Sequence, residues 1–350
     1  MKYWNTRLKK LSAYVPGEQP ANINEYIKLN TNESPFSPSE KVLQAIQKNT
    51  TASLRLYPDP LATEVRKIFA KEHGLELENI MVGNGSDEIF NLIFKGLIEP
   101  NKTVGLLDPS YSLYDTLAEA NDINVKKISL EKDFAIKLSP FLKIKTDLII
   151  LTNPNNPTGT YCPVEKINDF LSQYKGLLVI DEAYIDFYGG SAINLIKKYD
   201  NLIITRSFSK SYSLAGLRLG LAIASENLIA GLLKIKDSYN INRLAIIGAQ
   251  EALLDKKHLD YNLQMIKNNK EFLEEQLIEL GCQIIPSRAN FLFFKHPQIS
   301  SELLYQEFKK RKILVRHFPN NIAGDYIRVS IGTMMELKTF CKEFREILAT

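Results

Sequence analysis

A lysine among phosphate-binding groups is the most informative chemical feature of the sequence. Lys210 closes the run Ser207 to Lys210, which reads S-F-S-K, and Arg218 follows eight residues later. Hydroxyl and guanidinium groups bind phosphate, and an amine held beside a phosphate can bond to the aldehyde of pyridoxal 5′-phosphate (PLP). The spacing therefore indicates a lysine that carries this cofactor and, once released from it, moves a proton between two carbon atoms.

Two other polar clusters contain the groups that such a cofactor needs. Asp181 can keep the ring nitrogen of PLP protonated, so that the ring accepts electrons from a neighbouring carbanion. Tyr184 and Asn156 can hydrogen-bond to the phenolic oxygen of the ring and hold it ionised. We therefore expect Lys210, Asp181 and Tyr184 to be catalytic and Asn156 to bind the cofactor.

Each of these clusters follows an apolar run rich in Ile, Val and Leu. The runs occupy residues 148–151, 177–180 and 202–205. Such runs are typical of strands that are buried on both faces of a parallel sheet, and ligands of open α/β sheets bind beyond the carboxyl ends of such strands. Three strands are thus predicted to deliver the polar clusters to one crevice.

A glycine-containing turn supplies the expected anion site. Residues 80–83 are an apolar run that ends in glycine, and an amphipathic pattern follows from about Ser86. The pattern predicts a strand, a turn and a helix whose free N–H groups and dipole bind a phosphate. The third glycine of a dinucleotide fingerprint and the lysine of a P-loop are absent. The residues expected to hold the phosphate are Gly85, Ser86, Asp87, Ser207, Ser209 and Arg218.

Short motifs follow one another along nearly the whole chain of 350 residues. They are Tyr14 to Glu18, Leu29 to Glu33, Tyr57 to Asp59, Gly83 to Glu88, Asn155 to Gly159, Asp181 to Tyr184, Ser207 to Lys210 and Tyr326 to Thr333. In this order they resemble the fold type I PLP enzymes, in the class II aminotransferase branch, and within it the histidinol-phosphate aminotransferases. The resemblance implies an α/β fold, with a large domain built on a mainly parallel sheet flanked by helices and a smaller α+β domain.

The resemblance also implies roles for three tyrosines. Tyr111 matches the aromatic residue that stacks on the cofactor ring. Tyr57 matches a tyrosine that family members lend to the phosphate site of the neighbouring subunit, and Tyr14 matches an N-terminal residue that closes over the substrate. A homodimer with shared active sites is therefore implied.

Two arginines near the end of the chain are candidates for substrate binding. Arg328 alternates with Ile327 and Val329, the period of a half-buried strand, so it should lie on the polar face and fork onto a carboxylate or phosphate. In family terms Arg328 and Arg316 bind anionic groups of the substrate, and Asn156 belongs to the same site. Two cationic anchors suit glutamate or a phosphorylated amine.

We interpret the chain as a PLP-dependent aminotransferase of histidine biosynthesis that exchanges an amino group between L-glutamate and histidinol phosphate, whose keto partner is imidazole acetol phosphate. No residue in the sequence demands an imidazole, so other acceptors stay open, namely a triose phosphate or an aromatic 2-oxo acid. A decarboxylase resembling the threonine-phosphate decarboxylases is a second alternative. The third, a noncatalytic binding protein, is disfavoured by the presence of Lys210, Asp181 and Arg218 together.

Composition agrees with an ordinary enzyme. Charged residues make up 24% and hydrophobic residues 45% of the chain, and the formal net charge of +4 is spread rather than gathered in a stripe, so we expect no nucleic-acid partner. The three cysteines and four histidines show no metal-ligand spacing, which predicts no metal. No apolar run approaches a membrane span and no signal peptide is recognisable, so we expect a cytoplasmic protein without a membrane partner.

We expect three parts along the chain. An N-terminal arm, residues 1–37, contributes to the small domain and the active site; a large PLP-binding domain follows at 38–240 and a small C-terminal domain at 241–350. Within this last part, one long helix is predicted from about Ile246 to Leu280, because apolar positions recur at helical spacing until Gly281. Short strands and helices are expected to follow it.

Overall fold

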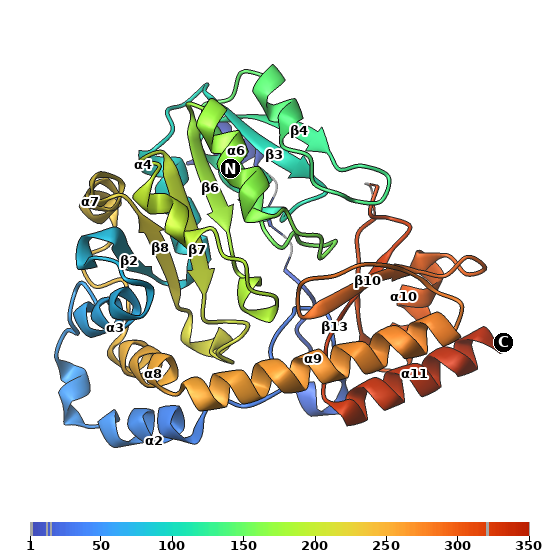
Figure 1. Ribbon diagram of the computed structural model, residues 1–350. Helices are drawn as coiled ribbons and strands as arrows, with labels where there is room; N and C mark the ends of the chain where they lie inside the picture. The colour runs from blue at the N-terminus through green and yellow to red at the C-terminus, as the bar shows by residue number, and fades with distance from the viewer. Residues whose placement is uncertain (1–2, 12, 15, 320–321, 350) are drawn as a thin grey trace.

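Seven strands of one sheet form the centre of the larger of two units in the computed structural model (Figure 1). The structure describes residues 3–11, 13–14, 16–319 and 322–349, so Val15 of the first motif lies outside the described residues. In sheet order, the strands are β2 (Ile80–Gly83), β8 (Gly220–Ala224), β7 (Leu202–Ser207), β6 (Leu177–Asp181), β5 (Leu148–Thr152), β3 (Thr103–Asp108) and β4 (Asn124–Ser129).

The three apolar runs predicted to be buried strands are β5, β6 and β7, and they pair in parallel. The strands β3 and β4 continue the parallel arrangement, whereas β8 runs antiparallel to both β7 and β2. Every residue of β5 is buried, as expected when helices cover both faces of a sheet. The predicted α/β architecture with a mainly parallel sheet flanked by helices is confirmed.

Alternate side chains of the strands pack against two different helical layers. Leu148 and Ile150 of β5 belong to one apolar core, and Ile149 and Leu151 belong to the other, which follows from the period of two in a strand. The first core includes side chains of α4 (Gly85–Gly96), α5 (Leu113–Ala120) and α7 (Glu226–Ile235), and the second includes those of α2 (Glu40–Asn49), α3 (Thr63–His73), α6 (Val164–Gln173) and α8 (Arg243–Leu254).

The smaller unit packs helices against an antiparallel sheet, and its core contains the stacked rings of Phe308 and Phe340. Figure 1 shows α9 as the longest helix, running along one side of the molecule beside α11. The strands are, in sheet order, β12 (Arg316–His317), β13 (Ile327–Ser330), β10 (Phe291–Lys295) and β9 (Gln283–Ile285), and the helices are α9 (Lys256–Glu279), α10 (Ser301–Lys310) and α11 (Met334–Leu348).

The N-terminal arm is tied to both units. Its short helix α1 (Thr6–Lys10) contacts α5 of the large unit. Further along, β1 (Ile27–Lys28) pairs in parallel with β11 (Ile313–Leu314) of the small unit. The arm therefore passes from one unit to the other close to the strand ends that carry the predicted site residues.

The prediction of one helix from Ile246 to Leu280 is wrong, because the segment forms two helices that meet at Asp255. Asp255 has the non-helical angles φ −90° and ψ 62°, and its carboxylate accepts a hydrogen bond from Lys41 at 3.2 Å. Apolar residues of α8 pack in the core of the large unit and those of α9 in the core of the small unit, so the break lets the chain change direction. The predicted domain boundary at 240/241 stays a prediction.

Short 3-10 helices lie at Ile23–Glu25, Ala52–Arg55, Leu77–Asn79, Ser139–Lys143, Ile185–Phe187, Ile193–Lys197 and Ala215–Leu217.

Candidate active site

The carboxyl ends of β5, β6 and β7 meet at one edge of the sheet, where Thr152, Asp181 and Thr205 are cross-strand neighbours. A cavity of about 470 Å³ adjoins this edge, and the arm and the small unit complete its wall. The structure thus brings together most of the predicted residues; those that line the cavity are Tyr14, Ser86, Asp87, Tyr111, Asn156, Asp181, Tyr184, Ser207, Ser209, Lys210, Arg218, Arg316 and Arg328.

Lys210 extends from the loop after β7 toward the arm. Its Nζ donates a 2.9 Å hydrogen bond to the backbone carbonyl of Thr31. Burial, together with the charge of Arg328, lowers the pKa of the Lys210 amine to about 8. About a tenth of this amine is therefore uncharged and nucleophilic at pH 7, far more than for an ordinary lysine.

Asp181 is a buried carboxylate whose partners are all neutral donors in the described part of the chain. Tyr114 Oη donates to its Oδ2 at 2.7 Å, and Oδ1 accepts from Thr205 Oγ1 at 3.1 Å and from the N–H of Ala183 at 3.2 Å. Burial raises the pKa of Asp181 to about 6, although these hydrogen bonds oppose the rise. A positively charged group beside it would stabilise the ionised form.

Tyr184 presents its hydroxyl to the same cavity. The oxygen accepts hydrogen bonds from Asn32 Nδ2 at 3.1 Å and from Asn156 Nδ2 at 3.4 Å, which leaves its own proton available to donate. Asn32 belongs to the arm, adopts a left-handed φ of 55°, and accepts a 3.0 Å hydrogen bond from Ser330 Oγ of β13. Tyr184 and Asn156 therefore lie as a pair, as predicted, and a residue of the arm joins them.

The residues predicted to bind the phosphate lie around the start of α4. Gly85 has φ +75°, and a Cβ added there would lie 2.6 Å from Nη2 of Arg218, so only glycine lets the guanidinium lie this close to the helix N-terminus. The first N–H groups of a helix have no partner within the helix. Arg218 also donates to Asp87 Oδ2 at 2.9 Å. The arrangement combines free N–H groups, a positive charge and the nearby hydroxyls of Ser207 and Ser209.

Two tyrosines also line the cavity. The rings of Tyr14 and Tyr111 meet edge to face, with centroids 5.8 Å apart. Tyr111 also meets Tyr114 edge to face at 5.5 Å. The face of Tyr111 is thereby held in a defined orientation, and its stacking on the cofactor stays a prediction.

The prediction that Arg328 lies on the polar face of a half-buried strand is wrong, because every residue of β13 is buried and Arg328 is only 6% exposed. Its Nη1 donates to Asn156 Oδ1 at 2.5 Å and its Nη2 to the carbonyl of Asn30 at 2.7 Å. Among the described residues, nothing accepts a hydrogen bond from its buried Nε. Burial lowers the pKa of Arg328 to about 10, and the charge of Arg316 acts in the same direction. Two neighbouring cations of this kind favour an anionic ligand.

Two predicted residues do not line this cavity, namely Gly85, which directly precedes Ser86 of its wall, and Tyr57. The side chain of Tyr57 is 76% exposed and stacks on Tyr239, with ring centroids 4.2 Å apart. The pair lines a separate groove of about 630 Å³. Within one chain, Tyr57 therefore has no contact with the phosphate site.

Sequence reasoning missed Tyr114 and assigned no role to Asn32. Tyr114 lies in the first turn of α5, three residues after Tyr111 of the preceding loop, and this short separation could have indicated a shared task. Asn32 reaches the site because the arm folds across it, and the contact to Ser330 joins residues 298 positions apart. No local pattern predicts such a contact.

The donor set fits PLP. The buried Asp181 has only neutral partners in the described chain and suits a protonated ring nitrogen, and the cradle at Gly85 and Arg218 suits a phosphate. Lys210, which lines the same cavity, would supply the amine for the aldehyde. Within the described residues, no cluster of three or more His, Cys, Asp or Glu side chains could hold a metal ion, and no helix is both long and apolar enough to cross a membrane.

Known proteins share this chain's sequence and fold. The family model for aminotransferase class I and II matches residues 24–344. Histidinol-phosphate aminotransferase of Clostridium acetobutylicum is 42% identical over 352 residues, 99% of each chain, and that of Citrifermentans bemidjiense is 41% identical over 340 residues, 97% of each chain. The crystal structure of histidinol-phosphate aminotransferase from Sinorhizobium meliloti in complex with pyridoxal-5′-phosphate covers 99% of both chains with a TM-score of 0.89 at 22% identity. Because the family model spans the segments that carry Asp181, Lys210 and Arg328, and the relatives match along almost the whole chain, the chain belongs to the class I and II aminotransferases, a family of PLP-dependent enzymes.

Proposed function

We propose that this aminotransferase exchanges an amino group between L-glutamate and histidinol phosphate, as part of histidine biosynthesis. The observation that carries the proposal is the identity of about 40% along nearly the whole chain to relatives named histidinol-phosphate aminotransferase. Aminotransferases with other acceptors and decarboxylases remain outcomes of the test below.

The residues of the cavity have separate tasks in such an exchange. When bound, PLP supplies a protonated ring that withdraws electrons from the carbon atom whose proton is moved. Asp181 would hold the protonated ring nitrogen, and Tyr184 with Asn156 would hold the phenolic oxygen. Lys210, with its lowered pKa, would accept the substrate proton at Nζ and return it from the same atom.

Two cations account for binding of substrates that carry anions. Arg328 presents a buried guanidinium whose Nε is unsatisfied within the described residues, and Arg316 approaches the same cavity from β12. Arg316 Nη1 donates to the carbonyl of Pro16 at 3.3 Å, so the arm helps to place it. A carboxylate or a phosphate between the two guanidinium groups would relieve their mutual repulsion.

A second copy of the chain completes the site in this proposal. Tyr57 and Tyr239 are exposed aromatic residues on a groove that also contains Asn84, the residue next to Gly85 of the phosphate cradle. Exposed aromatic surface of this kind is typical of a protein interface. We infer a homodimer in which Tyr57 of one subunit reaches the phosphate site of the other. We also place the enzyme in the cytoplasm, which is supported by its three free, buried cysteines.

The experiment that tests the proposed substrates is the absorbance spectrum of the PLP-loaded protein before and after addition of L-histidinol phosphate, with L-glutamate in a parallel sample. We expect both amines to convert the visible band of the cofactor into a near-ultraviolet band. Conversion by glutamate alone would show a transaminase with a different acceptor, such as another phosphorylated ketone or an aromatic 2-oxo acid. Conversion by neither amine would favour a decarboxylase, and carbon dioxide release from threonine phosphate would then be measured.

A further inference from the structure

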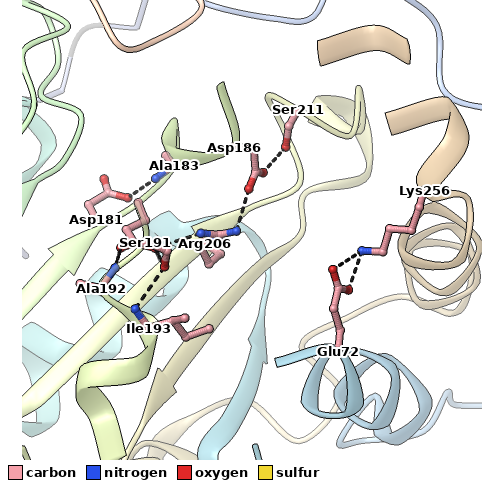
Figure 2. Close-up of polar contacts among 11 residues, drawn as sticks. Glu72, Asp181, Ala183, Asp186, Ser191, Ala192, Ile193, Arg206, Ser211 and Lys256 are labelled. Atoms are coloured by element: carbon pink, nitrogen blue, oxygen red, sulfur yellow. Dashed lines mark hydrogen bonds and ion pairs between the residues drawn. The ribbon is translucent and has the colours of Figure 1, made fainter. Parts of the chain in front are cut away.

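A buried ionic cluster lies behind the strand ends of the active site. Arg206 on β7 donates from Nη1 to Glu182 Oε2 at 2.9 Å and from Nη2 to Asp186 Oδ1 at 2.6 Å. Figure 2 shows the Arg206 guanidinium directed at Asp186, with the Ser191 to Ile193 loop on its other side. One guanidinium thus joins two carboxylates of the segment that follows β6.

The cluster continues to both sides through hydrogen bonds. Glu182 Oε2 accepts from Ser191 Oγ at 2.6 Å, and its Oε1 accepts from the N–H of Ala192 at 2.7 Å. Asp186 Oδ2 accepts from Ser211 Oγ, a contact that Figure 2 also marks. All four carboxylate oxygens therefore have donors.

The two ends of this network adjoin the two residues that would act on the cofactor. Glu182 follows Asp181 directly in sequence, and Ser211 follows Lys210 directly. Only Arg206 and Asp186 lie between Glu182 and Ser211 in this series of hydrogen bonds. The planar guanidinium of Arg206 binds both carboxylates in a fixed geometry. The network is thus a short connection between the backbone at Asp181 and the backbone at Lys210.

Burial makes this connection stiff. The side chain of Glu182 is 0% exposed and that of Arg206 is 13% exposed. Removal of one partner from a buried ion pair leaves an uncompensated charge, whereas apolar side chains of similar volume would stabilise a core at least as well. Stability alone therefore does not explain two acids and an arginine at this place. The neighbouring titratable groups are His73 of α3 and Tyr212, whose electrostatic contacts include Arg206 and Asp186.

We propose that Arg206 is a positioning residue, which holds the loop of Lys210 at a fixed separation from Asp181 through Glu182, Asp186 and Ser211. The inference rests on the roles of Lys210 and Asp181 in the proposed function. Because proton transfer and bonding to the cofactor need the amine within a narrow range of positions, a small displacement of the Lys210 loop changes both the proton affinity of its nitrogen and the rate.

The test compares two variants of the PLP-loaded enzyme. Arg206→Lys keeps a positive charge but cannot bridge both carboxylates in a fork. Ser211→Ala removes only the bond that joins Asp186 to the residue beside Lys210, and it carries the test if Arg206→Lys does not fold. The matched control is Arg311→Lys, because Arg311 likewise bridges two carboxylates, Glu307 and Glu343, but lies in the small unit and does not line the cavity.

The main readout is the pH at which the visible absorbance band of the bound cofactor changes, because this midpoint reports the proton affinity of the Lys210 nitrogen. We expect Arg206→Lys and Ser211→Ala to move the midpoint by about half a pH unit or more, and to lower kcat by about fivefold or more with a smaller effect on KM. Arg311→Lys should leave the midpoint and kcat unchanged.

Midpoints equal to that of the wild type in both variants, with only a lower Tm, would overturn the inference, because the network would then serve stability alone. A different substrate would leave this test unchanged, whereas failure of the role proposed for Lys210 looks different. In that case the wild type itself and Lys210→Ala would show the same spectrum, since Lys210 would not carry the cofactor.

Discussion

The phenol of Tyr114 donates a 2.7 Å hydrogen bond to Asp181 and so joins the first turn of α5 to the end of β6. The same oxygen lies 3.0 Å from Thr152 Oγ1. The ring of Tyr114 is completely buried and meets Tyr111 and Phe90 edge to face. One side chain therefore orients both the carboxylate expected at the ring nitrogen and the aromatic residue expected on the ring face.

Replacement of Tyr114 by Phe should weaken cofactor binding without unfolding the protein. The substitution keeps the ring but removes a hydrogen bond that lowers the pKa of Asp181, so this pKa should rise and the ionised fraction at neutral pH should fall. We expect the Kd for PLP to increase by about tenfold, measured by fluorescence titration of the apoenzyme. The control is Tyr174→Phe, which removes a buried hydroxyl bonded to Thr146 of the same unit. An equal change of Kd in both variants would contradict the role of Tyr114.

Arg328→Lys should separate substrate binding from cofactor binding. A lysine keeps the charge but loses the fork and the unsatisfied Nε, so we expect the KM for L-glutamate to rise by about 100-fold while the Kd for PLP changes by less than about twofold. Steady-state kinetics and cofactor titration measure the two quantities. Arg311→Lys is the control, because Arg311 bonds to Glu307 on α10 and not to the cavity. Similar increases of KM and Kd in Arg328→Lys would show that the guanidinium mainly supports the cofactor site.

The strands of the site could be predicted from sequence because their signal is local. Runs such as 148–151 are apolar on both faces, which is typical of a covered parallel sheet, and the residue types that follow them indicate the chemistry. The helix after Gly83 likewise begins where its turn residues indicate. Placement of Lys210 and Asp181 at one edge then follows from strand geometry.

The remaining parts depend on contacts between distant segments. Arg328 alternates with apolar residues in the pattern of a half-buried strand, but Asn156 and the arm cover its face and bury it. The break at Asp255 reflects the packing of α8 and α9 in different cores, which periodicity within the segment does not contain. The contacts of Arg206 are likewise not predicted by the motif that starts at Ser207, because its partners Glu182 and Asp186 follow β6.

Tyr57→Ala should reveal whether the active site is shared between subunits. The variant alone should bind PLP more weakly, because a hydroxyl to the phosphate is lost, while Lys210→Ala alone should be inactive. Refolded or co-expressed mixtures of the two variants should regain activity, because a mixed dimer contains one site with both Lys210 and Tyr57. Random pairing at equal amounts predicts about a quarter of the wild-type activity.

The control for this mixture is Lys210→Ala combined with the double variant Tyr57→Ala, Lys210→Ala, which contains no complete site in any pairing. Sedimentation of the wild type measures the oligomeric state directly. Absence of regained activity in a mixture that does contain mixed dimers would exclude a lent tyrosine and leave Tyr57 as a residue of the interface only.

Asp181→Asn should stabilise the apoenzyme at high pH and not at low pH. The folded-state pKa of about 6 lies above the ordinary value of 3.8, so the folded protein holds this proton more tightly than the unfolded chain. The stabilisation that this proton gives to the folded protein is fully present below about pH 3.8 and is lost as the pH rises through about 6. Above that pH the carboxylate is charged, and burial of the charge is unfavourable. Asparagine carries no charge, so the free energy of unfolding of the variant should exceed that of the wild type by about 2 kcal/mol at pH 8 and show no such excess at pH 4. Urea denaturation of the apoenzyme at both pH values measures this difference in the free energy of unfolding.

Asp59→Asn is a control of opposite sign. Burial alone would raise the pKa of Asp59, but the hydrogen bonds from the N–H groups of Leu61 and Thr63 outweigh burial, so the pKa is lowered. The variant Asp59→Asn should therefore lose more stability at pH 8 than at pH 4. An equal effect of Asp181→Asn at both pH values would mean that the carboxylate is already compensated without the cofactor.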